Sequence, residues 1–292
     1  MSERPVILFM FAGRRANLEI NLPQFMRIVE ENPRVQFHIW DLARNPEDSR
    51  YIQQIPNSDR VTVCTRFSGP QAPRSLNKVW QFYSSPRFSE ALFVKVDDDM
   101  VFVQTERFAE FVDAIENHTG HIMSAEVINN GACTEFVPAL WDGFLGLDIP
   151  LLDVHESNAY AEMCHEHMFD HWQKLVTRPT GLAEIQTWLS INFIGMDWER
   201  LCRITHKIGR VSPEWIADRQ WRMGSRMGDE GAANLFPRMV MTGFTTAHLG
   251  FGPQKITAEQ EEAWQFHYAS IGERYLAGLG PVQKLNTAGG SR

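Results

Sequence analysis

The sequence predicts an α/β fold in which a mostly parallel, Rossmann-like sheet is flanked by helices. Its 292 residues suit one large domain, and 43% hydrophobic with 22% charged residues is ordinary globular composition. Short apolar runs alternate with amphipathic segments along the first half of the chain. Repeated strand–helix units of this length favour parallel strands joined by right-handed crossovers.

The first elements are read from hydrophobic periodicity. Val6–Phe11 is a continuous apolar run, as expected of a strand buried on both faces. Leu22–Val29 has helical spacing and carries Pro23 in its first turn. Val35–Trp40 is a second strand that ends on Asp41. The same reasoning predicts helices at Pro46–Ile55, Ser75–Tyr83 and Glu106–Ile115, and strands at Val61–Cys64, Ala91–Val96 and Ile122–Val127.

The second half is less regular. His155–Lys174 and Gly181–Phe193 have helical patterns, and Leu235–Leu249 contains one or two strands. Thr257 and Gln260 have the spacing of a capping box before a last helix. We therefore expect one domain over residues 1–282, followed by a flexible tail at 283–292.

The formal net charge of −8 disfavours a general polyanion binder when it is taken as an average. Residues 135–171, however, contain eight Asp or Glu and no Lys or Arg, so this window alone carries the −8. The stretch Arg200–Arg226 is instead locally positive, with seven Lys or Arg against two acids. The charge is polarised, and an anionic ligand is not excluded.

Composition also bears on location. No apolar run approaches the ~20 residues that a transmembrane helix needs, and the first run lacks the charged lead-in of a signal peptide. Four cysteines without a CxxC pair indicate neither a disulfide framework nor a zinc ribbon. We expect a cytoplasmic protein.

Three consecutive aspartates, Asp97, Asp98 and Asp99, interrupt apolar residues at the end of a predicted buried strand. Such a cluster is costly unless a cation compensates it. Mg²⁺ and Mn²⁺ favour carboxylate oxygens and keep positions for phosphate. A calcium loop starting at Asp97 fails, because its sixth and twelfth positions are Phe102 and Phe108. A solvated turn is the other alternative, and a metal–phosphate site is favoured over it.

This stretch resembles the DxD motif of GT-A fold glycosyltransferases. Further resemblances lie at Ala12, Gly13 and Arg14 after the first strand, and at 124–130, 191–194 and 247–254, so the similarity spans about residues 5 to 255. The resemblance implies a GT-A fold with a nucleotide-sugar-binding half at 1–130 and a helical acceptor-side half at 131–282. It implies that Asp99 and His248 bind Mn²⁺ or Mg²⁺. The implied nucleotide-sugar contacts are Ala12, Gly13, Arg14, Asp41, Lys78, Asp97 and Asp98.

The pair Asp229 and Glu230 resembles the acidic pair that includes the catalytic base of inverting members. A carboxylate at that place would deprotonate the acceptor hydroxyl. The order differs from the commoner Glu–Asp, and we favour Glu230 over Asp229 as the base. The alternative is that Asp229 only caps a helix.

The expected function is a metal-dependent glycosyltransferase of the hexosyl or pentosyl class. It would move a sugar from a nucleoside diphosphate, UDP by preference, to a hydroxyl of a glycan, small molecule, protein or modified DNA. The alternatives are a phage-type enzyme acting on hydroxylated bases in DNA, a nucleotidyltransferase of similar fold, and a sugar-nucleotide or polyanion binding module without catalysis. The chain has no P-loop, GxGxxG or GxSxG motif of NTPases, dehydrogenases or hydrolases.

Two other segments carry open alternatives. Cys164, His165, His167 and His171 could hold zinc, but polar histidines on an amphipathic helix are the commoner explanation. The basic stretch Arg200–Arg226 is either a lid over a diphosphate, a surface for a polyanionic acceptor, or a solvated face.

Overall fold

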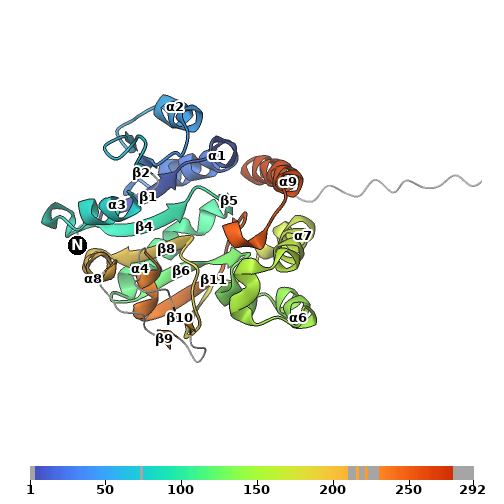
Figure 1. Cartoon of the computed structure of the whole chain (residues 1–292). Helices are drawn as coiled ribbons and strands as arrows, with labels where there is room; N and C mark the ends of the chain where they lie inside the picture. The colour runs from blue at the N-terminus through green and yellow to red at the C-terminus, as the bar shows by residue number, and fades with distance from the viewer. Residues whose placement is uncertain (1–3, 73–74, 210–214, 217–220, 223–229, 279–292) are drawn as a thin grey trace, which may run out of the picture.

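The structure is a computed structural model that describes residues 4–72, 75–209, 215–216, 221–222 and 230–278. It contains a curled sheet with both parallel and antiparallel strands, and helices lie on both of its faces (Figure 1). The predicted α/β class is therefore confirmed. The described strands are β1 (Val6–Ala12), β2 (Val35–Asp41), β3 (Val61–Cys64), β4 (Leu92–Asp97), β5 (Met100–Val103), β6 (Ile122–Ile128), β7 (Gly181–Ile185), β8 (Phe193–Asp197), β9 (Trp215–Ile216), β10 (Trp221–Arg222) and β11 (Arg238–His248).

Among the described residues, the main sheet has nine strands in the order β3-β2-β1-β4-β8-β6-β11-β5, with β7 also paired to β11. Within the described residues, β1, β2, β3, β4, β6 and β11 run in one direction, and β5, β7 and β8 run in the other. The sheet is thus mostly parallel, as predicted. The carboxyl ends of β1, β4 and β11 consequently meet at one edge, where ligands of such sheets bind.

The helices agree with the sequence in the first half more than in the second. The described helices are α1 (Arg15–Glu31), α2 (Pro46–Gln54), α3 (Leu76–Tyr83), α4 (Phe108–Asn117), α5 (Gly131–Thr134), α6 (Pro138–Gly146), α7 (Asn158–Leu175), α8 (Trp198–Lys207) and α9 (Ala258–Leu276). Thr257 and Gln260 form the predicted capping box of α9. The predicted helix at Gly181–Phe193 is wrong, because this segment begins with β7 and ends where β8 starts.

Residues 131–282 were expected to be a helical half. They do supply α6, α7 and α9, but they also supply β8 and β11 to the middle of the sheet. A bulge in β11 shifts its register against β6 between Met241 and Thr245. Gly243 sits there with φ +74°, and a Cβ would lie 2.3 Å from the Pro179 carbonyl oxygen, so the turn of the chain requires glycine.

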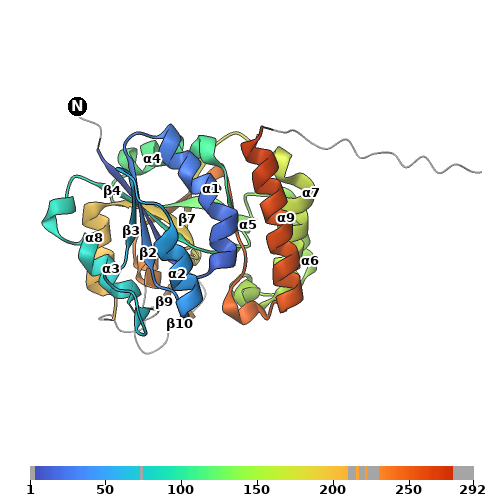
Figure 2. The ribbon, with the colours of Figure 1, turned by 90° about the horizontal axis from the view of Figure 1, so that it is seen from above.

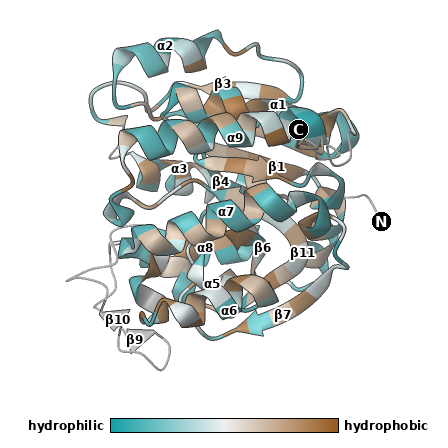
Figure 3. Ribbon diagram, turned by 90° about the vertical axis from the view of Figure 1, so that its right-hand side faces the viewer, coloured by the Kyte–Doolittle hydropathy of each residue, from teal (hydrophilic) through white to brown (hydrophobic). Residues whose placement is uncertain are grey.

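Two hydrophobic cores hold these layers together. The larger lies between the sheet and helices α1, α3, α4 and α8, and includes the strand residues of β1 and β4. The second lies between β5, β11 and helices α6, α7 and α9. α9 contacts both α1 and α7, as seen from above in Figure 2. Figure 3 shows the strands mostly in hydrophobic colours, whereas the outer helix α2 is mostly hydrophilic.

Two observations bear on the expected location. No helix in the described part of the chain is both long and apolar enough to cross a membrane. All four cysteines are free thiols, and burial raises the pKa of Cys64 and of Cys164 to about 12. At neutral pH these two thiols are therefore protonated and unreactive.

Candidate functional site

A pocket of about 410 Å³ opens where β1, β4 and β11 end. Its position follows from the register, since Phe11 of β1 lies beside Asp97 of β4, and His248 of β11 lies beside Met100 of β5. The lining residues are Phe11, Ala12, Gly13, Arg14, Leu42, Arg44, Leu76, Asp97, Asp98, Asp99, Asn192, Glu230, His248, Gly250, Phe251 and Gly252. Segments from residue 11 to residue 252 therefore meet around one polar cavity.

Asp98 fastens the loop after β1 to the end of β4. Its Oδ2 accepts a 2.8 Å hydrogen bond from the Gly13 amide, and its Oδ1 accepts from the Arg14 guanidinium. Asn21 of α1 donates to the Asp98 carbonyl oxygen at 2.7 Å. Burial raises the pKa of Asp98, although Arg14 opposes that shift. Asp98 is buried and its oxygens are engaged, so its role is to shape the pocket.

Asp99 pairs with two basic side chains. Its Oδ2 lies 2.8 Å from Arg14 Nη2 and 3.3 Å from His248 Nε2. Burial acts to raise the pKa of Asp99, but His248 and Arg14 together hold it well below the usual range. The carboxylate is therefore ionised. Asp99 Oδ1 and His248 Nδ1 are buried and have no hydrogen-bond partner among the described residues.

Lys95 organises the other side of the pocket. It is fully buried, and its Nζ lies 2.6 Å from Asp97 Oδ1, 3.2 Å from Glu230 Oε1 and 3.0 Å from the Ile191 carbonyl oxygen. Burial would lower the pKa of Lys95, but the two carboxylates outweigh it and raise that pKa. The ammonium is therefore charged, and it neutralises carboxylates that could not otherwise be buried together.

Asp97 is the carboxylate of this group that solvent reaches, with a quarter of its side chain exposed. Burial raises its pKa to about 6, with Lys95 acting in the opposite direction. A carboxylate with such a pKa ionises close to neutrality, which is the range in which a general base is most effective. Glu230 is more deeply buried, and its Oε2 has no partner within the described residues.

Most of the residues expected from the sequence meet in this pocket: Ala12, Gly13, Arg14, Asp97, Asp98, Asp99, Glu230 and His248. Asp41 does not line it, because its carboxylate accepts hydrogen bonds from Ser49 and Gln53 of α2 at 2.7 and 2.8 Å. Lys78 lies on the exposed side of α3 and lines a different cavity. Asp229 lies outside the described residues.

Sequence reasoning passed over Lys95, Asn192 and Phe251. Lys95 carried a signal, since a lysine inside the run Leu92–Val96 must be buried with the strand and must then be paired. Asn192 and Phe251 lie in loops, and they reach the pocket only because β8 and β11 are neighbours of β4 and β5. Both fall in the segments 191–194 and 247–254 that carry the resemblance, but among these residues the resemblance gives a role only to His248.

The histidine cluster of α7 divides between interior and surface. His165 is fully buried, with Nε2 2.8 Å from the Leu249 carbonyl oxygen and Nδ1 2.7 Å from the Tyr268 hydroxyl. Burial lowers its pKa to about 3, so the ring is neutral. His167 and His171 face each other with ring centroids 4.7 Å apart. In the described ranges no group of three or more His, Cys, Asp or Glu could hold a metal ion, which gives no support to a zinc site.

Most of the basic stretch Arg200–Arg226, with the expected lid, lies outside the described residues. Its first arginine is part of the interior. Arg200 of α8 is buried, its guanidinium donates to the Gly120 carbonyl oxygen, and it lies 4.4 Å from the Phe236 ring. Arg200 therefore belongs to neither a lid nor a solvated face.

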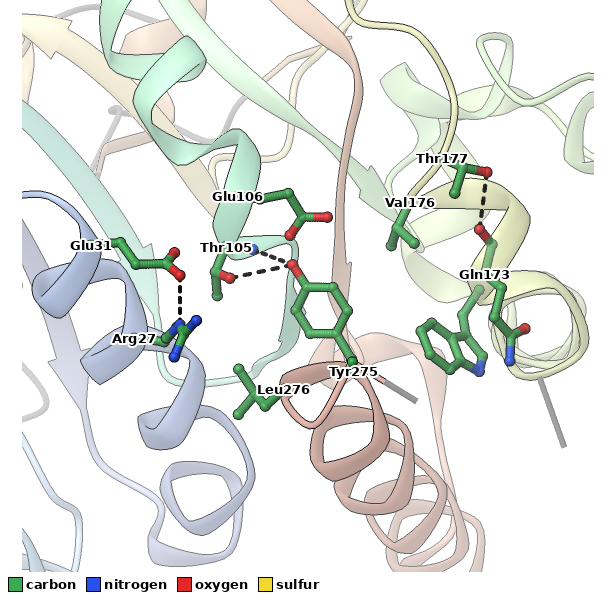
Figure 4. Close-up of a pocket in the computed structure, with 11 residues that line it drawn as sticks. Arg27, Glu31, Thr105, Glu106, Gln173, Val176, Thr177, Tyr275 and Leu276 are labelled. Carbon is green, nitrogen blue, oxygen red and sulfur yellow. Dashed lines mark hydrogen bonds and ion pairs between the residues drawn. The ribbon is translucent and has the colours of Figure 1, made fainter. Parts of the chain in front are cut away.

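A cavity of about 510 Å³ lies away from these groups, between the carboxyl-terminal ends of α1, α7 and α9 (Figure 4). Arg27 and Glu31 form an ion pair at its rim, and the Thr105 amide donates to the Tyr275 hydroxyl at 2.7 Å. None of its lining residues has a buried polar atom without a partner in the described chain. Chemistry is therefore expected at the carboxylate pocket and not here.

Comparison with known proteins finds similarity to a different family from the expected one. Residues 87–177 match the family model described as dehydroquinase class II. The 3-dehydroquinate dehydratase of Herpetosiphon aurantiacus is 35% identical over 69 residues, which is 24% of this chain and 47% of that protein. That of Prochlorococcus marinus is 38% identical over 85 residues, 29% of this chain and 55% of that protein. The chain spans about half the length of the curated relatives it matches.

Among solved structures, a 4-diphosphocytidyl-2C-methyl-D-erythritol synthase from Anaerococcus prevotii is similar over 42% of this chain and 54% of that one. The TM-score is 0.30 at 13% identity. This similarity is too low to assign either fold or function.

The matches overturn the glycosyltransferase prediction, because the family model and both relatives are dehydroquinases. The expected sugar transfer, the UDP-sugar donor, the glycan, protein or DNA acceptors and the nucleotidyltransferase alternative are wrong for the same reason. The physical origin of the error is the carboxylate cluster. Its compensating cations are Arg14, which lies far from it in sequence, and Lys95, which lies inside a strand, and His248 contacts Asp99.

The expected Mn²⁺ or Mg²⁺ at Asp99 and His248 is corrected too. It rested on the glycosyltransferase resemblance, which the dehydroquinase matches contradict. In the structure Asp99 and His248 pair with each other, and Arg14 supplies a further positive charge at 2.8 Å.

Proposed function

We propose that the chain is a dehydratase that removes water from 3-dehydroquinate or a closely related hydroxylated cyclic keto acid. One observation carries the proposal. The segment that matches dehydroquinase class II, residues 87–177, also supplies Lys95, Asp97, Asp98 and Asp99 to the pocket. The segment that is similar to dehydroquinases therefore also contains candidate catalytic residues of the pocket.

The reaction requires two proton transfers. 3-Dehydroquinate is a ring carboxylate with a ketone and a hydroxyl placed β to it. A base takes a proton from the carbon between them, the electron pair of that C–H bond forms a C=C bond, and the β C–O bond breaks. An acid protonates the departing oxygen, which leaves as water. The product is a conjugated enone, and no external oxidant or reductant is needed.

The pocket offers groups for each part of this reaction. We assign to Asp97 the role of the base that takes the carbon-bound proton, because it is ionised near neutrality, partly exposed and held in place by Lys95. We assign to the pair of His248 and Asp99 the role of the acid that protonates the departing oxygen. Arg14 and Arg44 line the opening, and Arg14 keeps nearly half of its side chain exposed, so these guanidiniums suit the substrate carboxylate. Glu230 and Asp97 both form an ion pair with Lys95, so Glu230 contributes to the charge balance on the Lys95 side of the pocket.

Three expectations about the whole chain remain part of the proposal. For the fold we propose a GT-A-like arrangement, supported by strand β8 running antiparallel between β4 and β6 and by the carboxylates that follow β4. Fold does not determine function, so this is compatible with a dehydratase. We also propose one domain over residues 1–282 with a short tail, and a cytoplasmic location, which the four free thiols favour.

The test is to incubate the purified chain with 3-dehydroquinate and to follow the ultraviolet absorption of the conjugated enone. We expect turnover, and we expect His248→Gln to reduce kcat by about 100-fold to 10,000-fold, the usual contribution of a positioned acid or base. Asp113→Asn is the control, since this carboxylate on α4 is exposed and does not line the pocket. Absence of enone with the unaltered chain would contradict the proposal.

A further inference from the structure

A third cavity, of about 580 Å³, lies over the exposed side of α3 and the loop that precedes it. Seven residues line it: Arg66, Phe67, Lys78, Gln81, Phe82, Ser85 and Arg87. We call this the α3 basic surface. It shares no lining residue with the carboxylate pocket, and the proposed dehydratase reaction makes no use of it.

The α3 basic surface is positive in a chain whose net charge is −8. Its lining includes three cationic side chains and no Asp or Glu. Within the described ranges, Arg66, Lys78 and Arg87 form no ion pair, whereas Arg14, Lys95 and Arg178 each pair with carboxylates. The three charges are therefore available to an external anion.

An aromatic floor holds these cations in place. The Arg66 guanidinium lies 5.6 Å from the Phe67 ring centroid and 5.7 Å from that of Phe82. The Arg87 guanidinium lies 4.6 Å from the Phe82 centroid, and Lys78 Nζ lies 5.9 Å from that of Phe67. Each cation therefore rests on a ring face, and cation–π attraction fixes its position.

The floor is itself rigid, because it continues into the core. Phe67 stacks on Trp40 with ring centroids 5.3 Å apart, and Phe82 meets the edge of Trp40 at 5.2 Å. Trp40 is almost fully buried and its indole donates to the Tyr83 hydroxyl at 2.9 Å. Cations held in this way lose less conformational entropy when an anion binds than freely moving surface side chains do.

The spacing of the charges suggests how many anionic groups the ligand has. Arg66 and Arg87 contact the same Phe82 ring, so their guanidinium carbons are at most about 10 Å apart. Arg66 and Lys78 are linked in the same way through Phe67. A single small anion satisfies one such group, whereas a molecule with two or three oxyanion groups can contact all of them.

From these observations we propose that the α3 basic surface is a binding site for a small polyanion, a ligand with two or more phosphate or carboxylate groups. Guanidiniums recognise both groups through paired hydrogen bonds, and the ammonium adds a point charge. The site is separate from the candidate active site, and it stands whether or not the chain is a dehydratase.

Calorimetric titration at constant ionic strength tests the proposal, with pyrophosphate and citrate as the two probes. We expect one of them to bind at one equivalent per chain, and the preferred probe distinguishes phosphate from carboxylate ligands. The combined variant R66Q/K78Q/R87Q should lose affinity at least 10-fold while its circular dichroism stays unchanged, because all three side chains are exposed.

Two controls separate this site from general electrostatics. R50Q/K174Q/R203Q removes the same charge from exposed positions elsewhere and should bind the probe as the unaltered chain does. R44Q alters the opening of the carboxylate pocket and should also bind normally. The proposal is overturned if neither probe binds, if R44Q abolishes binding, or if both triple variants lose affinity equally.

Discussion

In the described part of the chain, two clusters combine buried carboxylates with cations, and only in one of them are all the buried oxygens paired. Glu126 of β6 is fully buried, accepts from both terminal nitrogens of Arg178, and also accepts from the Gly243 amide at 3.2 Å. In the carboxylate pocket, Asp99 Oδ1, Glu230 Oε2 and His248 Nδ1 have no partner among the described residues. Buried polar groups are normally paired, so unpaired ones around a cavity indicate a site that is organised for a ligand.

The two clusters also differ in what surrounds them. Arg178 additionally donates to the Phe136 carbonyl oxygen at 2.6 Å, which ties β6 to the segment after α5. The carboxylate pocket is instead bordered by loops and by exposed parts of Arg14 and Asp97. We propose that the Glu126–Arg178 pair serves stability and that the carboxylate pocket serves chemistry. Substitutions in each cluster test this division.

The largest effect is expected on turnover from Asp99→Asn. This change removes the charge that faces His248 and Arg14, so kcat for enone formation should fall by about 100-fold or more. The free energy of unfolding, measured by urea titration, should fall by less than in Arg178→Ala, because Arg14 keeps its ion pair with Asp98 and nearly half of its side chain is exposed. A variant that unfolds easily but still turns over normally would assign Asp99 to stability instead.

Arg178→Ala should show the opposite pattern. It leaves Glu126 buried without its cation, and breaking a buried pair in this way costs about 3 kcal/mol or more. Urea unfolding should show this loss, while kcat stays within about twofold at temperatures where the variant is folded, since catalytic loss requires a change at the reacting groups. A large fall in kcat in the fully folded variant would end the distinction between the two clusters.

A third test uses His165, which is buried and has both ring nitrogens hydrogen-bonded. In this it is like Glu126, whose two oxygens are also paired. The pKa of His165 in the folded chain is about 3, below the usual 6.5. Its contribution to stability is therefore fully present above pH 6.5 and is lost as the pH falls toward 3, by up to about 1.4 kcal/mol per pH unit. Urea midpoints at pH 7.5, 6 and 5 measure this slope.

His165→Gln should flatten that acid slope, and His171→Gln on the same helix should leave it in place. An equal slope in the unaltered chain and in His165→Gln would show that another group dominates acid unfolding. His38 has the same direction of shift, with a pKa lowered to about 4 by burial, so a residual slope is expected.

The smallest effect is expected from an ion pair outside both clusters. Arg27 and Glu31 are 2.5 Å apart on α1, with side chains 52% and 37% exposed. Solvent screening reduces such pairs to about 0.5 kcal/mol or less. Arg27→Gln should therefore leave both the urea midpoint and kcat nearly unchanged, and a loss comparable to that of Arg178→Ala would mean that burial is not what separates these pairs.

The sequence predicts the parallel part of the fold well, because strands such as Val6–Ala12 are apolar throughout and helix α9 begins at a capping box. It does not predict β5, whose four residues directly follow the turn at Asp98 and Asp99. It also misassigns β7, which is an edge strand that exists by pairing with β11. Pairings between segments that are distant in sequence leave no local pattern.

For the candidate site, the sequence locates the carboxylates but not what neutralises them. Asp97, Asp98 and Asp99 are conspicuous because they end an apolar strand. Arg14 and His248 come from segments 84 and 149 residues away from their partners, and only the strand order brings them together. A divalent metal and an arginine–histidine pair satisfy the same charge requirement, so composition alone did not distinguish them.

We propose that the carboxylate pocket dehydrates 3-dehydroquinate with Asp97 as the base. The most direct measurement is a nuclear magnetic resonance time course of 3-dehydroquinate with the unaltered chain and with Asp97→Asn, with substrate binding to each measured by calorimetry. We predict that the unaltered chain forms the enone, and that Asp97→Asn binds the substrate but leaves it unchanged. Equal rates of enone formation by the two proteins, or no enone from either, would contradict the claim.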